Sequence, residues 1–435
     1  MTDSEFTSNA HTTTSWFRHA APYIHAHRDA TCVIAIDSAT LTLAKSTALI
    51  QDLALLNSLG LRLVITFDAH LQVAAACDKQ AITLSYHQHA PIIDDKALVI
   101  AQAAIGQLLF HLHAQFSFKL PDTPIAKSAL RCSSGNFVTA KPLGIHQGVD
   151  LHHSGAVRKI DTAAIEQQLD LGNIVILPPL GYSSTGDIFY LSGDEIASAC
   201  AQTLAADKLI FLTDPNPTLP REMTLAQAED YLSDNITSAP TPLRLAITAC
   251  QNTVKRVHLL DRHQDNALIQ ELYSRDGAGT MISAHHYEST RRAGIEDIAG
   301  ILSLIQPLEE KGILVKRSRE TVELSIEHYI VMERDGRVIG CAALHPYDNE
   351  RIGELACLAV ADDYQHQGRG EVLLQAIILQ AKKQDLETLY SLTTQTSHWF
   401  IEQGFISSTI DELPIEKQSL YNYQRNATVL VRKLT

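Results

Sequence analysis

The sequence lacks the cysteine spacing of a metal-binding or disulfide-rich protein. Its seven cysteines are scattered, and no two form a C-x-x-C pair. Scattered thiols of this kind are typical of reduced cysteines, so we expect a cytoplasmic protein. The 20 histidines include the adjacent pairs His152-His153 and His285-His286, which do not have the four-residue spacing of a helical metal site. We therefore predict that the protein uses no metal.

Positive charge is also scarce. Lys and Arg number 35 against 49 Asp and Glu, which gives a formal net charge of −14. This balance argues against binding to nucleic acid or to an acidic membrane surface. Residues 1–15 contain no Lys, no Arg and no apolar run, so we expect a disordered N-terminus and no targeting signal there. We also expect no membrane span, which requires about 20 apolar residues in succession.

The length of 435 residues suggests two or three domains. Up to about residue 260, short runs of β-branched residues alternate with amphipathic segments. The expected strands are Cys32–Ile36, Leu61–Thr66, Asn136–Ala140, Asn173–Leu177 and Lys208–Leu212. The expected helices include Ala48–Leu59, Lys96–Gln115 and Ile196–Ala206. This alternation predicts an α/β domain of three layers, with a mostly parallel sheet covered on both faces.

The pattern changes from about Thr290 onward. The segments His328–Arg334 and Arg337–His345 are joined by Asp335-Gly336, a strong hairpin signal. Arg351–Val360 follows as a third strand, and Glu371–Lys383 as a helix. We expect a first domain at residues 16–283, a linker at 284–289 and an α+β domain at 290–435.

A glycine-rich loop, Gln365-His-Gln-Gly-Arg-Gly370, separates this third strand from its helix. A turn that opens a helix directs backbone N–H groups towards a pyrophosphate. The spacing Gln365-x-x-Gly368-x-Gly370 resembles the acetyl-coenzyme A loop of the GNAT-type N-acetyltransferases, and Leu392–Phe405 resembles a later part of that fold. The resemblance implies acetyl-CoA as co-substrate. The implied cofactor-binding residues are Leu358, Ala359, Val360, Gln365, Gln367, Gly368, Arg369, Gly370 and Glu371.

Three further stretches, Pro307–Glu320, Glu354–Val360 and Arg425–Arg432, resemble the bacterial N-acetylglutamate synthases. That family transfers acetyl to the α-amine of L-glutamate, the first step of arginine biosynthesis. The amine must lose a proton before it attacks the thioester. Glu354 lies on the strand beside the loop and matches the family's base.

The same resemblance implies the rest of the catalytic site. Backbone N–H groups around Cys357 and Leu358 would stabilise the oxyanion. Thr393 would protonate the departing thiolate, with Tyr421 or Tyr423 as the alternative donor. Two substrate carboxylates call for cationic groups. The implied substrate-binding residues are Lys316, Arg317 and Arg425, with Cys357 lining the pocket by apolar contact and not carrying the acyl group.

The first domain, from about Phe17 to Met281, resembles the amino-acid kinase family, which includes acetylglutamate kinase. The matching stretches include Gly148–Asp161 and Tyr190–Asp214. Phosphoryl transfer needs a glycine-rich loop and a lysine after the first strand. Val33–Thr40 ends with neither, and the second loop, Phe67–Gln72, also lacks glycine. We therefore expect no kinase activity.

The resemblance implies a regulatory role for this domain, with L-arginine as the effector. An ordinary glycine turn between domains is the alternative explanation for the segment near residue 277. The implied effector-binding residues are Tyr23, Lys208, Glu271, Arg275, Gly277 and Gly279. The helix Trp16–His27 resembles the one through which the family assembles hexamers from dimers, so we expect a homo-oligomer.

The sequence thus predicts an arginine-sensitive N-acetylglutamate synthase. One alternative is an acetyltransferase of the same fold acting on another amino acid or amine; a diamine acceptor would call for carboxylates in place of Lys316, Arg317 and Arg425. The other alternative is an arginine sensor that has lost catalysis. The intact glycine loop and Glu354 argue against it.

Overall fold

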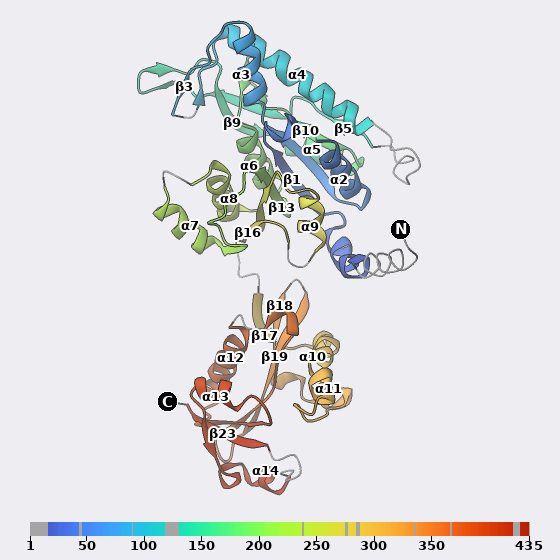
Figure 1. Ribbon diagram of the computed structural model, residues 1–435, viewed down its shortest axis with the longest axis vertical. Helices are drawn as coiled ribbons and strands as arrows, with labels where there is room; N and C mark the ends of the chain where they lie inside the picture. The colour runs from blue at the N-terminus through green and yellow to red at the C-terminus, as the bar shows by residue number, and fades with distance from the viewer. Residues whose placement is uncertain are drawn as a thin grey trace, which may run out of the picture. The chain divides into compact units, whose positions relative to one another are not determined.

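The computed structural model describes residues 16–42, 46–88, 90–117, 130–236, 239–274, 277–283, 288–334, 336–365, 368–420 and 427–434. The chain forms two compact units, Met1–His285 and His286–Thr435 (Figure 1). Each unit has its own sheet and its own core.

An eight-stranded sheet forms the centre of the first unit, with the order β14-β16-β15-β13-β1-β2-β10-β5. All its neighbouring strands are parallel except β15 and β16. The strands are β1 (Thr31–Ile36), β2 (Arg62–Phe67), β5 (Cys132–Ser133), β10 (Ile174–Leu177), β13 (Lys208–Thr213), β14 (Glu222–Thr224), β15 (Arg256–Asp261) and β16 (Thr280–Ser283).

Helices cover both faces of this sheet, because alternate strand residues point to opposite sides. On β1, Ile34 and Ile36 belong to one core cluster, whereas Val33 and Ala35 belong to another. The first cluster contains side chains of α2 (Ser46–Ser58), α3 (His70–Lys79), α4 (Asp95–Ser117) and α9 (Ala267–Tyr273). The second contains side chains of α5 (Thr162–Asp170), α6 (Gly193–Thr203), α7 (Leu225–Asp234) and α8 (Thr241–Asn252). The predicted three-layer α/β architecture is confirmed.

One predicted strand lies in a different sheet. The segment expected at Asn136–Ala140 forms β6 (Val138–Pro142), which pairs antiparallel with β9 (Gly155–Ile160). Together with β11 (Leu180–Tyr182) and β12 (Ile188–Tyr190) these strands make a separate four-stranded sheet, β12-β11-β6-β9. Two short ribbons lie outside both sheets: β3 (Tyr86–His87) with β4 (Ala90–Pro91), and β7 (Ile145–His146) with β8 (Val149–Asp150).

The expectation that no segment is long and apolar enough to span a membrane is wrong for α4. This helix has 23 residues and meets that criterion by length and composition alone. Its buried side chains, including Ile100, Ile105 and Phe116, belong to the core of the first unit. One face of α4 therefore packs on the core of the first unit, as in a helix that covers a sheet.

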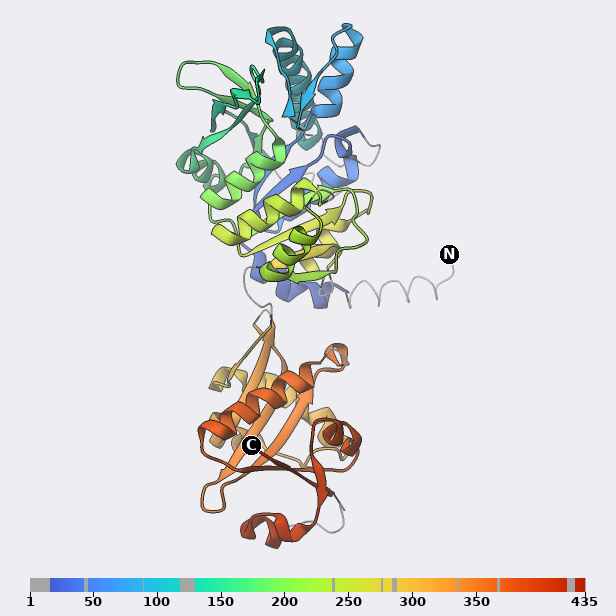
Figure 2. The same cartoon turned by 90° about the vertical axis from the view of Figure 1, so that its left-hand side faces the viewer.

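The second unit contains a seven-stranded sheet of order β17-β18-β19-β20-β21-β23-β22, in which only β20 and β21 are parallel neighbours. Helix α12 (Arg369–Lys383) packs on one face and α10 (Ile298–Glu310) on the other (Figure 2). Gly336 has φ +74° after the hairpin residue Asp335, which is outside the described residues. The strands are β17 (Glu288–Arg292), β18 (Tyr329–Arg334), β19 (Arg337–Tyr347), β20 (Ile352–Val360), β21 (Thr388–Thr393), β22 (Ile406–Ser408) and β23 (Thr428–Lys433). The remaining helices are α11 (Arg319–Leu324), α13 (Ser397–Glu402) and α14 (Ile415–Leu420).

Candidate active site

Strands β20 and β21 separate in the middle of the second sheet. They pair only where Ile352–Glu354 lies beside Thr388–Tyr390, although β20 continues to Val360 and β21 to Thr393. Beyond Glu354 the facing edges of the two strands are not hydrogen-bonded to each other. An extended ligand can bind such an opening through main-chain hydrogen bonds.

A β-bulge lies on β20 next to this opening. The register between β19 and β20 shifts between Cys341 and Ala343, opposite Cys357 and Leu358. Cys357 has φ +51°, in the left-handed region that a non-glycine residue rarely adopts. A bulge leaves one residue out of the ladder, so its N–H is available to another acceptor. This is the position that the sequence predicts for oxyanion stabilisation.

The glycine-rich turn begins where β20 ends. Nε2 of Gln365 donates to the carbonyl of Val360 at 3.0 Å. Gly368 adopts φ +75° and precedes α12, whose first N–H groups have no acceptor within the helix. A Cβ on Gly370 would lie 3.3 Å from the Trp399 ring, so this position has little room for a side chain. The predicted residue Gln367 lies outside the described residues.

The position of Arg369 in the glycine-rich loop suggests that its side chain binds phosphate, but the side chain contacts Glu288 instead. Its Nε lies 2.7 Å from Oε2 of Glu288, and its guanidinium carbon lies 5.1 Å from the centre of the Tyr364 ring. Burial disfavours the charge of Glu288, but Arg369 and Arg334 outweigh it and lower the pKa of that carboxyl. The guanidinium of Arg369 is therefore engaged by partners within the second unit.

Glu354 lies in an open pocket of about 380 Å³ between β19, β20 and α14. Its Oε2 lies 2.8 Å from Nζ of Lys417 and accepts a hydrogen bond from the Tyr390 hydroxyl at 3.1 Å. Only 7 % of Glu354 is exposed, so the carboxylate depends on these two donors. The pocket is lined by Arg317, His328, His345, Pro346, Tyr347, Glu354 and Lys417.

The two histidines of the pocket, His328 and His345, lie close to each other. His345 faces Glu354 in the register of β19 and β20, and its ring centre lies 5.3 Å from that of His328. Burial lowers the pKa of His345 to about 4. His345 is therefore neutral at physiological pH and adds no charge to the pocket.

The structure brings together some of the predicted site residues and not others. Arg317 lines the pocket with Glu354, whereas Lys316 is exposed and is not among the lining residues. Thr393 is buried and its hydroxyl lies 2.9 Å from that of Thr396. The other predicted residues of this end of the chain, Tyr421, Tyr423 and Arg425, lie outside the described residues.

Burial raises the pKa of the Cys357 thiol, which lies 3.5 Å from the Tyr329 hydroxyl. The thiol is thus protonated at neutral pH and is a poor nucleophile. This environment agrees with the predicted apolar role of Cys357.

Sequence reasoning missed Lys417, Tyr390 and His345. Lys417 lies 63 positions beyond Glu354, in a short helix with no motif of its own. The signal for the other two is strand pairing. Tyr390 is the neighbour of Glu354 in the parallel pairing of β20 with β21, and His345 is its neighbour in the antiparallel pairing of β19 with β20. Correct pairing of the predicted strands would therefore have placed Tyr390 and His345 beside Glu354, whereas the position of Lys417 follows only from the folded structure.

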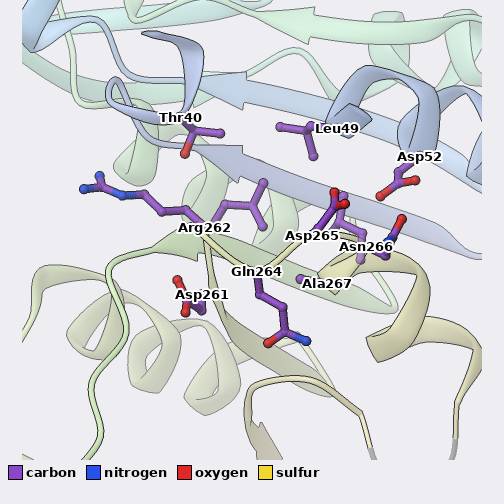
Figure 3. Close-up of a pocket in the computed structure, with 11 residues that line it drawn as sticks. Thr40, Leu49, Asp52, Asp261, Arg262, Gln264, Asp265, Asn266 and Ala267 are labelled. Atoms are coloured by element: carbon purple, nitrogen blue, oxygen red, sulfur yellow. The ribbon is translucent and has the colours of Figure 1, made fainter. Parts of the chain in front are cut away.

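At the carboxyl end of the first sheet, ion pairs occupy the position of a kinase phosphate loop. Arg262 forms an ion pair with Asp37, which follows β1. It forms a second ion pair, at 2.6 Å, with Asp214, which follows β13. Burial, together with Asp68 and Asp37, raises the pKa of Asp194 to about 7, so this edge disfavours anions. The adjoining pocket, which Figure 3 shows with Arg262 and Asp265 on its walls, measures about 30 Å³. That is room for about one water molecule.

Two of the predicted effector residues, Lys208 on β13 and Glu271 on α9, act on the same histidine of β15. Oε1 of Glu271 lies 2.5 Å from Nδ1 of His258, a residue that the sequence did not suggest. Oε2 of Glu271 accepts from the N–H of Gly279 at 3.0 Å. Lys208 is buried, and its charge acts on His258, whereas Tyr23 packs against the core cluster around α9. Gly277 has φ +64°, and Arg275 lies outside the described residues.

The two units match two known families. Residues 30–261 match the amino acid kinase family, and residues 296–405 match the acetyltransferase (GNAT) family. The amino-acid acetyltransferase of Proteus mirabilis is 45% identical over 430 residues, which are 96% of this chain and 97% of that protein. This chain belongs to the amino-acid acetyltransferases. A second member, from Pseudomonas fluorescens, is 43% identical over 97% of this chain and 99% of that protein.

Solved structures of an amino-acid acetyltransferase relative cover both units. N-acetylglutamate synthase from Neisseria gonorrhoeae, in complex with coenzyme A and L-arginine, has a TM-score of 0.88 and 36% identity. The match covers 97% of this chain and 99% of the gonococcal chain. The same enzyme with coenzyme A and N-acetyl-glutamate has a TM-score of 0.60 and 37% identity, with the same coverage. Within the described ranges, no group of three or more His, Cys, Asp or Glu residues is placed to hold a metal.

Proposed function

We propose that this amino-acid acetyltransferase is an N-acetylglutamate synthase, which transfers acetyl from acetyl-CoA to the α-amine of L-glutamate and is feedback-regulated by L-arginine. The observation that carries the proposal is the pocket of the second unit. It combines one carboxylate, Glu354, with two cations, Arg317 and Lys417, beside the opening between β20 and β21.

Acetyl-CoA fits the elements around this opening. The thioester supplies an activated acetyl group. The strand edge at Leu358, Ala359 and Val360 offers main-chain groups to an extended ligand. The N–H groups of Gly368, Arg369, Gly370 and Glu371 at the start of α12 suit a pyrophosphate, with Gln365 holding the loop against β20. The gonococcal relative was solved with coenzyme A, which supports this assignment.

The chemistry of the pocket follows from Glu354. This carboxylate takes a proton from the α-ammonium of glutamate, directly or through a water molecule. The neutral amine attacks the thioester carbonyl, so a C–N bond forms and the C–S bond breaks. The N–H group freed by the bulge at Cys357 stabilises the oxyanion. As the C–S bond breaks, Thr393 gives its hydroxyl proton to the thiolate, which leaves as a free thiol, and Thr393 regains a proton from the new amide nitrogen, which must shed its second proton at this step. The proton on Glu354 returns to solvent.

Glutamate is favoured as acceptor by the charges that face it. Its two carboxylates match Arg317 and Lys417, and its ammonium group matches Glu354. A diamine would bring positive charge to two cations, which electrostatics opposes. This argument ranks glutamate above the alternative amine acceptors that the sequence left open.

Arginine regulation is supported by the first unit. Its buried Glu271 is a carboxylate of the kind that binds a guanidinium, and Lys208 is a cation suited to the arginine carboxylate. The relative solved with L-arginine supports this effector. The ion pairs at the kinase edge leave this domain without a phosphate site, which agrees with a regulatory role.

The test is thiol release from acetyl-CoA, measured with glutamate, with other amino acids, and with and without arginine. We expect release that depends on glutamate and a rate that arginine changes. Glu354→Gln should bind acetyl-CoA but lose about 10²- to 10⁴-fold in rate, whereas the exposed control Glu323→Gln on α11 should behave like the wild type. Absence of glutamate-dependent release would refute the proposal.

A further inference from the structure

The pair formed by Lys417 and Glu354 has a consequence for catalysis. A base that must take a proton lies 2.8 Å from an ammonium group that neutralises it. Burial works against the charge on Lys417, but Glu354 outweighs it, and the pKa of Lys417 is raised. The lysine is therefore charged at neutral pH, and it occupies the carboxylate that must accept the substrate's proton.

The charges in the pocket cancel when glutamate enters. Glu354 is the carboxylate among the lining residues, Arg317 and Lys417 are the cations, and His345 is neutral, so these groups sum to +1. Glutamate carries two carboxylates and one ammonium group, which sum to −1. The occupied pocket is therefore neutral overall, and both carboxylates of the substrate can have a cationic partner only if Arg317 and Lys417 each pair with one of them. One of the two available cations is the partner of the base.

Lys417 is placed so that it can change partner. It lies on α14, a helix of six residues, and its side chain is 32% exposed. Tyr390 donates to the same carboxylate oxygen at 3.1 Å and is fully buried, so it keeps Glu354 in position after the lysine moves. Exchange of an ion pair costs little when the new partner is also a carboxylate.

We propose that Lys417 is a counter-ion that the substrate displaces: the side-chain carboxylate of glutamate takes Lys417 from Glu354 and so activates the base. One ion pair is replaced by two, Lys417 with the substrate carboxylate and Glu354 with the α-ammonium. This inference rests on the proposed glutamate acetylation. It makes Lys417 a positioning residue that couples selectivity to rate, because an acceptor without a side-chain carboxylate leaves the base paired.

Glutamine is the matched probe, since it differs from glutamate only in its side-chain amide. In the wild type, we expect the acid limb of the kcat–pH profile to lie at higher pH with glutamate than with glutamine, because only glutamate releases Glu354 from Lys417. In Lys417→Met the two limbs should coincide. A lysine with a purely structural role would leave both limbs in place.

Steady-state rates give a second readout. Lys417→Met should lower kcat/KM for glutamate roughly 10- to 100-fold, the effect of one hydrogen bond to a charged group, and should leave that for glutamine unchanged or raised. Lys417→Arg should restore part of the preference for glutamate. Lys383→Met, on α12 across the sheet, is the control and should behave like the wild type.

Two results would overturn the inference: an equal loss with both acceptors in Lys417→Met, or coincident acid limbs in the wild type. The second is measured without any variant, so it holds even where Lys417→Met fails to fold. A wild type that acetylates no glutamate contradicts the proposed function itself, which separates the two failures.

Discussion

Glu271 holds together three elements of the regulatory domain, and this can be tested by two substitutions. Its Oε1 lies 2.5 Å from Nδ1 of His258 on β15, and its Oε2 accepts from the N–H groups of Ala278 at 2.5 Å and Gly279 at 3.0 Å. Burial alone would raise the pKa of Glu271, but these hydrogen bonds outweigh it and lower the pKa. The carboxylate is therefore ionised at neutral pH and ties α9 to β15 and to the turn before β16.

Glu271→Met keeps the length of the side chain and removes both acceptors. Three donors then lose their partner at a position where the side chain is 6% exposed. Each buried donor without an acceptor costs about 1–3 kcal/mol, so for three donors we expect a loss of about 3–9 kcal/mol. A domain of this size loses about 2–4 °C in Tm per kcal/mol, which gives a fall of at least about 6 °C.

Glu271→Gln should cost much less, because an amide can keep all three bonds. Its oxygen can accept from Ala278 and Gly279, and its NH2 group can donate to Nδ1 of His258. The proton of the imidazole then moves to Nε2, which is buried without a partner among the described residues. We expect a loss of about 1–2 kcal/mol, which reflects the weaker, uncharged hydrogen bonds.

Differential scanning calorimetry at pH 7.5 measures both variants, with the exposed Glu166→Gln on α5 as the control, which we expect within about 0.5 kcal/mol of the wild type. The pKa of Glu271 is lowered on folding. Its contribution to the free energy of unfolding is therefore complete at pH values above the ordinary pKa range of Glu, and it is lost as the pH falls through the pKa of Glu271 in the folded state. The difference between wild type and Glu271→Gln should thus be constant between pH 7 and 8. Equal Tm values for the Met and Gln variants would refute the reasoning.

Three further predictions concern the two sheets. A Cβ on Gly193 would collide with the Phe67 carbonyl oxygen, so Gly193→Ala should lower the free energy of unfolding, measured by calorimetry, by about 1–3 kcal/mol. In Gly106→Ala on α4 the added Cβ meets open space, so this substitution should raise the free energy of unfolding by about 0.5–1 kcal/mol. Because burial raises the pKa of Cys357, Cys357→Ala should retain kcat within about tenfold, and a loss above about 10³-fold would indicate an acyl-cysteine. Tyr390→Phe removes a donor to the Glu354 carboxylate, so the acid limb of the rate profile should move to higher pH; an unmoved limb would contradict this role.

The elements that the sequence predicted well are those with strong local signals. Alternating β-branched runs found β1, β2, β10 and β13 to within one or two residues, because their burial on both faces requires continuous apolar segments. The sheet to which a strand belongs is not a local property. The segment that became β6 was predicted as a strand like the others, and only its pairing with β9 places it in a second sheet.

The site divides in the same way. The glycine turn before α12 and the base Glu354 follow from spacing and resemblance. The bulge at Cys357 has no signature in the run Ala356-Cys357-Leu358, because it arises from the register with β19. Likewise the contact of Arg369 with Glu288 joins residues 81 apart, so a loop position that suggested phosphate binding proved to hold a structural ion pair.

Two cations of the chain, Arg262 and Lys417, are paired with carboxylates in the two candidate ligand sites, and their surroundings differ. Arg262 is 15% exposed and has two carboxylate partners, Asp37 and Asp214, so removing it would leave two like charges together. Lys417 is 32% exposed, lies on a short helix, and shares its partner with Tyr390, so it can leave without stranding Glu354. The first pairing therefore fills the carboxyl end of the first sheet, whereas the second, as we propose, holds Glu354 until a substrate brings its own carboxylate.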